Sequence, residues 1–299
     1  MTGVGEDHRA GFVALVGRPN VGKSTLLNQI LGRKLAIVTP KPQTTRNRIL
    51  GIETRPGVQF LFVDTPGLHE PRNLLGERMV KAARQSLAEA DVALLVLDSI
   101  VGITDRDREL AGELGNAKQP VVIALNKIDR VTKKQLLELA AELDRLLPGR
   151  HVVPVSALTG ENVPELLRTL QTHLPVSPPL FPPDMQTDLP ERFFAAEIVR
   201  EQLLLATHEE VPYQSAVRIE SFTEREGKNL VVIEATILVA RPSQRAIVLG
   251  EKGARIKHIG QNARLELERF LGTRVYLDLH VKVDEKWFTK PHTLGELGL

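Results

Sequence analysis

Residues 17–24 carry the strongest chemical signal in the chain. Their sequence, GRPNVGKS, follows the pattern G-x-x-x-x-G-K-S, with an apolar run before it (12–16) and a helix-compatible stretch after it (23–31). Between a strand and a helix, this pattern predicts a loop whose backbone N–H groups bind phosphate. Lys23 would neutralise the terminal phosphates, and Ser24 would bind Mg²⁺. The expected nucleotide-binding residues here are Gly17, Arg18, Pro19, Asn20, Val21, Gly22, Lys23, Ser24 and Thr25.

Two downstream segments predict the groups that respond to the terminal phosphate. The proline- and threonine-rich stretch 39–46 reads as a loop in which Thr45, in preference to Thr44, supplies a hydroxyl to Mg²⁺. The sequence DTPG, at 64–67, follows a second apolar run at 58–63. Asp64 would hold the Mg²⁺ shell through water, and Gly67 would direct its N–H at the γ-phosphate. Thr65, Pro66 and Leu68 complete the nucleotide-binding residues expected in this segment.

The quartet NKID at 126–129 predicts which base is bound. Guanine presents two adjacent donors, N1–H and the 2-amino group. The Asp129 carboxylate can accept both, whereas adenine would leave it unpaired. Asn126 would tie the loop to neighbouring backbone, and the Lys127 stem would cover the purine. The other residues expected around the base are Ile128 and, with backbone N–H groups for the guanine O6, Ser156, Ala157 and Leu158.

The elements that must position these residues alternate between strand and helix patterns. Continuous apolar runs at 91–98 and 120–125 are typical of parallel strands that are covered on both faces. Helical patterns lie between and after them, and Thr132 with Gln135 predicts a capping box. We therefore expect residues 11–174 to form an α/β P-loop NTPase domain, with a mostly parallel sheet and helices on both faces.

Composition limits the remaining functions. The 299 residues include no cysteine, which excludes disulfides, zinc–thiolate sites and thiol catalysis. No stretch approaches the ~20 apolar residues of a membrane span, and the polar residues 1–10 read as a disordered lead. The net charge of only +2 argues neither for nor against a nucleic-acid partner, and the distribution of the charges matters more.

The proline-rich stretch 175–190 predicts a semi-rigid linker, and a second domain follows it. Patterns over 191–284 run helix, strand, strand, helix, helix, strand, which predicts a smaller α+β domain. Its GEKG sequence between two helices would let backbone N–H groups approach nucleic-acid phosphates. The C-terminal extension, 285–299, has two interpretations: Trp287 and Phe288 beside lysines would add stacking and charge to an RNA surface, or the extension would be a solvated tail. The expected RNA-binding residues are Gly250, Glu251, Lys252, Gly253, Arg255 and Lys257.

Together, GRPNVGKS, the threonine pair, DTPGL, NKID and SAL resemble the Era and tRNA-modification branch of GTPases, and the GEKG region resembles a type II K-homology (KH) domain. A single GTPase domain, a proline linker and one KH domain are the organisation of the Era family. In that branch an apolar residue at the position of Leu68 replaces the water-orienting glutamine. The asparagine at the position of Asn20 helps to hold K⁺.

The resemblance implies a slow, Mg²⁺-dependent and K⁺-stimulated GTPase with GTP and GDP as ligands. Asn20, Lys23, Thr45 and Gly67 would act on the transferred phosphoryl group. Ser24, Thr45 and Asp64 would bind Mg²⁺, and Asn20 would bind K⁺. The implied partners are 16S ribosomal RNA near its 3′ end and the 30S subunit during assembly. It also implies a cytoplasmic monomer with peripheral association at the inner membrane.

Other functional classes are open to test. An ATP-using enzyme could share the phosphate loop, but NKID argues against it. A tRNA-modification GTPase would need a C-terminal cysteine, which this chain lacks. A tandem GTPase would need a second phosphate loop. An RNA-binding module with a degenerate nucleotide site would show no stabilisation by Mg²⁺–GDP.

Overall fold

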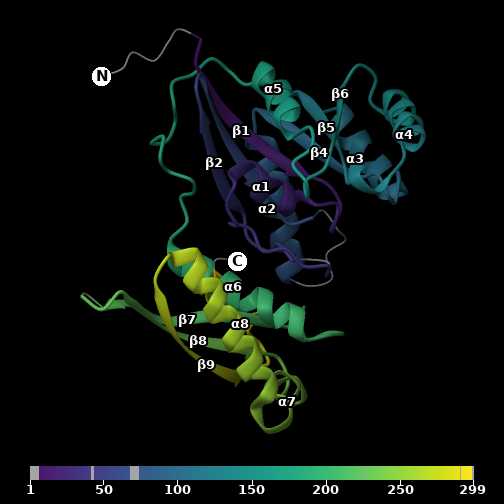
Figure 1. The fold of residues 1–299 in the computed structure, drawn as a ribbon. Helices are drawn as coiled ribbons and strands as arrows, with labels where there is room; N and C mark the ends of the chain where they lie inside the picture. Colours follow the sequence, from purple (N-terminus) through teal and green to yellow (C-terminus); the bar gives the residue numbers. More distant parts are fainter. Residues whose placement is uncertain (1–6, 42–43, 68–73, 226, 290, 298–299) are drawn as a thin grey trace. The chain divides into compact units, whose positions relative to one another are not determined.

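The computed structural model describes residues 7–41, 44–67, 74–225, 227–289 and 291–297 (Figure 1). The chain divides into two compact units. The first unit comprises Met1–Ala36, Thr45–Glu70 and Met79–Asp188. The second comprises Ile37–Thr44, Pro71–Arg78 and Leu189–Leu299. Two short segments from the N-terminal half of the chain therefore group with the C-terminal half.

A six-stranded sheet forms the centre of the first unit, in the order β2-β3-β1-β4-β5-β6 (Figure 1). Five strands run parallel, and β2 at the edge pairs antiparallel with β3. The mostly parallel sheet predicted from the sequence is confirmed. The strands are β1 (Arg9–Val16), β2 (Ile49–Arg55), β3 (Val58–Asp64), β4 (Val92–Asp98), β5 (Val121–Asn126) and β6 (His151–Val155).

Helices cover both faces of this sheet (Figure 1). Ala93, Leu95 and Leu97 of β4 pack with the apolar sides of α2, α3 and α4. The alternate residues of the strand point to the opposite face, where α1 and α5 lie. The helices are α1 (Lys23–Leu31), α2 (Leu74–Glu89), α3 (Asp105–Gly115), the 3₁₀ turn η1 (Ile128–Arg130), α4 (Lys133–Leu146) and α5 (Val163–His173).

The parallel order brings several loops to one edge of the sheet. The phosphate loop follows β1, and the DTPG segment begins at the last residue of β3. NKID begins at the last residue of β5, and the 156–158 loop follows β6. Because parallel strands place their carboxyl ends at the same edge, segments far apart in sequence can build one ligand site.

The proline-rich stretch expected to be a linker is packed on the first unit as far as residue 188. The amide of Ile52 donates to the Gln186 carbonyl at 2.8 Å. Phe181 and Met185 pack against a buried cluster from β2 and β3. This segment therefore partly covers the edge strand β2, whose open backbone groups would otherwise invite pairing. At the other end, β1 begins at Arg9, so the last two residues of the expected N-terminal lead are strand.

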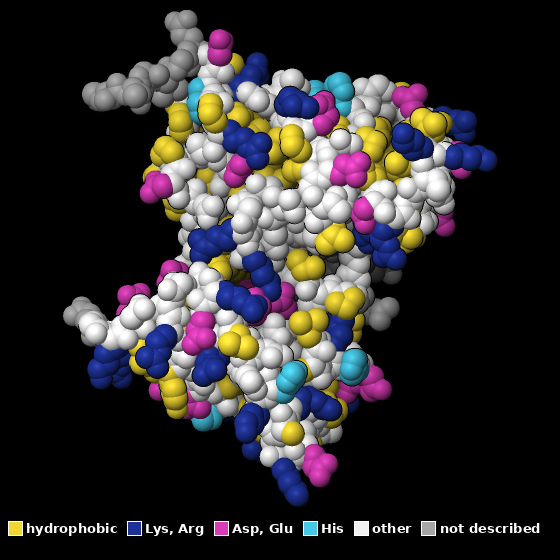
Figure 2. Space-filling model, viewed as in Figure 1, with side chains coloured by type: hydrophobic (Ala, Val, Ile, Leu, Met, Phe, Trp, Pro, Cys, Tyr) yellow, Lys and Arg dark blue, Asp and Glu magenta, His cyan; other side chains and the backbone are white. Residues whose placement is uncertain are grey.

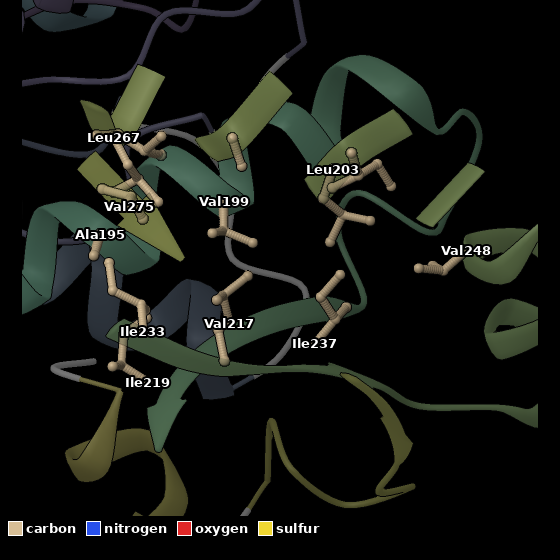
Figure 3. Close-up of a cluster of buried hydrophobic side chains, with 14 of the residues drawn as sticks. Ala195, Val199, Leu203, Val217, Ile219, Ile233, Ile237, Val248, Leu267 and Val275 are labelled. Carbon is tan, nitrogen blue, oxygen red and sulfur yellow. The ribbon is translucent and has the colours of Figure 1, made fainter. Parts of the chain in front are cut away.

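The second unit contains a three-stranded sheet in the order β7-β8-β9, antiparallel and then parallel. Its core joins Ala195, Val199 and Leu203 of α6 to the sheet and to α8 (Figure 3). The predicted element order is confirmed. The elements are α6 (Glu191–Ala206), β7 (Ser215–Arg225), β8 (Leu230–Val239), α7 (Pro242–Leu249), the 3₁₀ turn η2 (Glu251–Gly253), α8 (Ala254–Leu271), β9 (Arg274–Val283) and α9 (Pro291–Glu296). No helix in the described ranges is long and apolar enough to cross a membrane.

Candidate nucleotide-binding site

The phosphate loop depends on two glycines with unusual backbone geometry. Gly17 has φ of 150°, and a Cβ there would lie 2.4 Å from the Val96 carbonyl oxygen. Gly22 has φ of 101°, and a Cβ there would lie 2.3 Å from Nδ2 of Asn126. No other residue fits either position without moving its neighbours. The loop then passes directly into α1 at Lys23, as a phosphate-binding helix N-terminus requires.

Lys23 is buried at the centre of the loop. Its Nζ donates to the carbonyls of Gly17 at 2.9 Å and Arg18 at 3.0 Å. Burial lowers the pKa of Lys23 to about 8, although the charge of Asp64 opposes this shift. A phosphate in the loop would supply the anion that this desolvated ammonium lacks.

Three oxygen-bearing side chains meet beside Lys23. Ser24 Oγ donates to Asp64 Oδ2 at 2.7 Å and lies 2.9 Å from Thr45 Oγ1, which is 3.4 Å from the same carboxylate oxygen. The other oxygen, Asp64 Oδ1, is buried and has no hydrogen-bond partner of ordinary geometry among the described residues. Burial raises the pKa of Asp64, and Lys23 and the hydroxyl donors offset part of that shift.

Hard oxygen donors around an unsatisfied carboxylate are the ligands that Mg²⁺ prefers, so this cluster fits the ion. Thr44 does not join it. Its hydroxyl donates to the Lys41 carbonyl at 2.7 Å and lies 2.7 Å from Thr39 Oγ1. The geometry therefore favours Thr45 over its neighbour as the metal ligand.

Asn126 joins the two halves of the site. Its Nδ2 donates to the Val21 carbonyl at 2.8 Å in the phosphate loop, and its Oδ1 accepts the Ala157 N–H at 2.9 Å. Ser156 Oγ donates to Asp129 Oδ1 at 2.6 Å. The Asp129 carboxylate is exposed to solvent and is oriented by this serine. One end of the site can thus hold phosphates while the other presents a fixed acceptor pair to a base.

The GEKG turn has the open geometry that close backbone approach requires. Gly250 and Gly253 have φ of 70° and 78°, and a Cβ at Gly253 would meet no atom within 4 Å. Lys252 has φ of 48° and is exposed, as are Glu251 and the basic Lys257. Dark-blue basic side chains lie over the α7–α8 region of the second unit in Figure 2.

Known proteins resemble the chain over nearly its whole length. Residues 12–127 match the family model described as "50S ribosome-binding GTPase", and residues 210–288 match the KH domain model. The chain is 47% identical to GTPase Era of Geotalea daltonii, over 98% of both proteins. Identity to GTPase Era of Syntrophus aciditrophicus is also 47%, over 97% of this chain and 95% of that one. The chain belongs to the Era family of GTPases.

Solved Era structures share both units. An Era variant from Aquifex aeolicus bound to GDP and AlF4⁻ has a TM-score of 0.92 and 45% identity, over 97% of this chain and 99% of that one. Era in complex with MgGDPNP and nucleotides 1506–1542 of 16S ribosomal RNA has a TM-score of 0.93, with the same identity and coverage. The P-loop and KH folds of this Era-family chain are therefore shown.

The side chains of several expected site residues bond elsewhere or lie exposed, so any ligand contact from these residues would come from their backbone. The Arg18 guanidinium donates from Nε to both carboxylate oxygens of the buried Asp107 at 2.8 Å, so only its main chain belongs to the phosphate loop. Thr65 Oγ1 donates to the Leu15 carbonyl at 3.1 Å and anchors the DTPG segment. Leu158 is 74% exposed. Leu68 lies outside the described residues.

Sequence reasoning missed two residues that support the Era-family site. Asp98 Oδ2 accepts Lys127 Nζ at 2.6 Å, while the same ammonium reaches the Asn20 carbonyl at 2.9 Å. Asp107 pairs with Arg18 and also caps α3 together with Thr104. Asp98 ends β4, so its strand-end position after a buried run was an available signal. For Asp107 the available signal was its spacing of three residues after Thr104, which is typical of a helix cap.

The expected stacking role of Trp287 is wrong. Its side chain is 0% exposed, and its Nε1 donates to the Gln214 carbonyl at 3.1 Å. Its indole forms an edge-on contact with Phe288. A buried indole with a satisfied N–H is a structural residue and cannot stack on a base.

The basic Arg255 remains on the surface near the GEKG turn, but its guanidinium donates to the Ile247 carbonyl.

Proposed function

We propose that this Era-family GTPase is a GTP-controlled switch that binds 16S ribosomal RNA near its 3′ end and acts in 30S subunit assembly. The observation that carries the proposal is the single hydrogen-bonded constellation formed by Asn126 with the phosphate loop and the 156–158 loop. Together with Asp129, it favours a guanine nucleotide over an adenine nucleotide. The GTPase domain would span 11–174 and the RNA-binding domain 191–284.

The proposed chemistry divides the site by charge. Lys23 would hold the β- and γ-phosphates, and the Gly67 N–H would contact the γ-phosphate and release on hydrolysis. When bound, Mg²⁺ would neutralise phosphate charge as it develops in the transition state. Ser24, Thr45 and Asp64 would hold that ion, with Asp64 acting through water. Asn20 would hold K⁺ beside the phosphates.

RNA recognition is assigned to the GEKG turn and its basic neighbours. Exposed Lys252 and Lys257 supply charge, and the open Gly253 leaves room for a phosphate against the backbone. The solved complex of Era with nucleotides 1506–1542 of 16S ribosomal RNA supports RNA binding by this family. Cytoplasmic location, a monomeric state and peripheral membrane association are carried over from the family resemblance alone.

Nucleotide selectivity tests the proposal. Nucleotide-free chain should be stabilised by Mg²⁺–GDP, by about 2.7 kcal/mol at a hundredfold excess over Kd, and unchanged by Mg²⁺–ADP. Asp129→Ala should abolish the preference because it removes the acceptor pair, whereas Asp144→Ala, at an exposed acid on α4, should retain it. Thermal unfolding measures the shifts. Equal stabilisation by both nucleotides would contradict a guanine site.

RNA binding is tested with a labelled oligonucleotide from the 3′ end of 16S RNA. Lys252→Glu should weaken binding by about tenfold at low salt, since one cation near phosphate is replaced by an anion. Lys228→Glu, at an exposed lysine in the β7–β8 turn, serves as the matched control and should bind normally. Fluorescence anisotropy measures the affinity. Equal losses in both variants would remove the GEKG turn from the interface.

A further inference from the structure

Helix α6 in the second unit buries two different faces. Ala195, Val199 and Leu203 lie on the apolar face that packs into the core of the unit (Figure 3). Glu197, Arg200, Glu201 and Leu204 lie on the opposite face at helical spacing, and all four are buried. Charged side chains are rarely buried without partners, so this second face must contact something polar.

That partner, within the second unit, is the segment Ile37–Thr44, which overlaps the predicted loop 39–46. The Val38 N–H donates to Glu201 Oε1 at 3.0 Å. Lys41 Nζ donates to the Leu204 and Thr207 carbonyls, which belong to the last turn and the cap of α6. The helix thereby gains a cation at the end where its dipole is negative.

The third contact holds the end of the segment. Arg200 donates to the Thr44 carbonyl. Its Nε and Nη2 also donate to the two carboxylate oxygens of Glu197, at 2.7 and 2.6 Å. This fork–fork ion pair fixes the orientation of the guanidinium. The carbonyl one residue before Thr45 is therefore anchored to a rigid, buried group.

Three described residues of the segment, Thr39, Lys41 and Thr44, also bond to one another. Thr39 Oγ1 accepts the Lys41 N–H at 3.2 Å and lies 2.7 Å from the Thr44 hydroxyl, which donates to the Lys41 carbonyl. A segment braced in this way transmits a restraint from α6 to its last residue. Thr45 follows through one peptide bond, and its hydroxyl reaches Ser24 and Asp64.

We propose that α6 is a positioning element for the GTPase site. Arg200 through Thr44, the last carbonyls of the helix through Lys41, and Glu201 through Val38 together hold Thr45 in place for Mg²⁺–GTP. This inference rests on the proposed role of Thr45 as a metal ligand. The restraint favours the nucleotide state that uses the threonine hydroxyl. Weakening it lowers affinity for GTP with its Mg²⁺ and leaves GDP binding unchanged, because GDP lacks the γ-phosphate that orders this segment.

The experiment uses Lys41→Met in the full-length chain, which keeps the aliphatic stem and removes the ammonium. The Mg²⁺ concentration for half-maximal GTP hydrolysis should rise about five- to tenfold, the scale of one charge-assisted hydrogen bond. The ratio of affinities for a non-hydrolysable GTP analogue and GDP should fall by a similar factor. Lys118→Met, at an exposed lysine after α3, is the matched control and should match the parent in both measurements.

A second variant separates positioning from folding. Arg200→Lys retains a charge opposite Glu197 but loses the planar fork, so it should shift Mg²⁺ dependence in the same direction. Glu201→Gln retains an acceptor for Val38 and should behave like the parent. Thermal unfolding confirms that each variant is folded. A purely structural role would weaken GTP and GDP binding equally.

The outcomes distinguish the inference from the function beneath it. The positioning role would be overturned if Lys41→Met and Arg200→Lys fold and keep the Mg²⁺ dependence and the GTP:GDP affinity ratio of the parent. This conclusion requires that Thr45→Ala shifts both measurements. If Thr45→Ala leaves both unchanged, the proposed metal ligand itself is wrong. A parent chain that hydrolyses no GTP would instead overturn the proposed function.

Discussion

Asn20 illustrates how one backbone angle decides a test of ion binding. It has φ of 65°, a left-handed conformation that asparagine and glycine tolerate better than alanine does. Asn20→Gly therefore removes the side-chain amide without adding backbone strain. Asn20→Ala removes the amide but also strains the backbone. The Lys127 ammonium on the Asn20 carbonyl can remain in place in the glycine variant.

We expect the parent chain to hydrolyse GTP several-fold faster in K⁺ than in Na⁺ at equal ionic strength. A bound cation would offset phosphate charge that the Arg18 guanidinium, paired with Asp107, does not neutralise. Asn20→Gly should make the two rates equal. Phosphate release measures both. A parent rate that is the same in the two salts would exclude the K⁺ assignment.

At this scale, residues chosen from ligand chemistry could be placed in one site from the sequence, while their roles stay predictions. Asp129 was expected from the donor pattern of guanine, and the structure places it with Ser156. Lys41 and Arg200 could not be predicted, because their partners lie far away in sequence and no motif marks them. Trp287 was misread because an aromatic residue among lysines has the same local pattern in a core as on an RNA surface.

Among the elements, β6 and α5 bring together two histidines. The rings of His151 and His173 lie 5.3 Å apart between centroids, and His173 Nε2 is buried with no partner among the described residues. Burial lowers the pKa of His173, and the nearby His151 and Arg150 add to the shift. The folded chain therefore resists a proton that the unfolded chain accepts.

Because the folded pKa of His173 lies below its unfolded value, the unfolded state binds more protons as pH falls through that unfolded value. Stability is then lost progressively until the folded pKa is passed. His173→Gln should reduce the fall in unfolding midpoint between pH 7.5 and pH 5.5. His258→Gln, at an exposed histidine on α8, should leave it unchanged. An identical fall in parent and His173→Gln chains would rule out this histidine as a cause.

Helices with clear start and stop residues in the sequence were predictable to the residue. α1 runs from Lys23 to Leu31 between Gly22 and Gly32, both in left-handed conformations, and matches the expected span 23–31. The capping box at Thr132 is present. α2 begins at Leu74, although the clear helical pattern in the sequence starts only at Lys81, because Gly76 lowers the helix propensity of the first turn.

At the scale of the whole molecule, the sequence predicted two folds and a proline-rich boundary. It did not predict that Ile37–Thr44 would group with the second unit. Local pattern reports periodicity and turn chemistry, whereas that grouping depends on long-range hydrogen bonds to α6. The packing of residues up to 188 on β2 was missed for the same reason.

A fragment containing only 189–299 should retain its core but lose the partners of the polar face of α6. Its α6 amides should exchange faster than in the full chain, since Glu201 and the last carbonyls no longer meet Val38 and Lys41. Glu201→Ala should speed that exchange strongly in the full chain and little in the fragment. Hydrogen exchange measures all four samples. Equal effects of the substitution would argue against this coupling.

The contacts of Ile37–Thr44 also limit which parts of the chain can be exchanged between relatives by recombination. Positions 38, 41 and 44 should vary across relatives together with 200 and 201, and independently of the phosphate loop that lies nearer in sequence. A recombination event in the proline-rich stretch would separate partners that must match. Exchange of C-terminal halves between relatives should therefore succeed when this short segment travels with them.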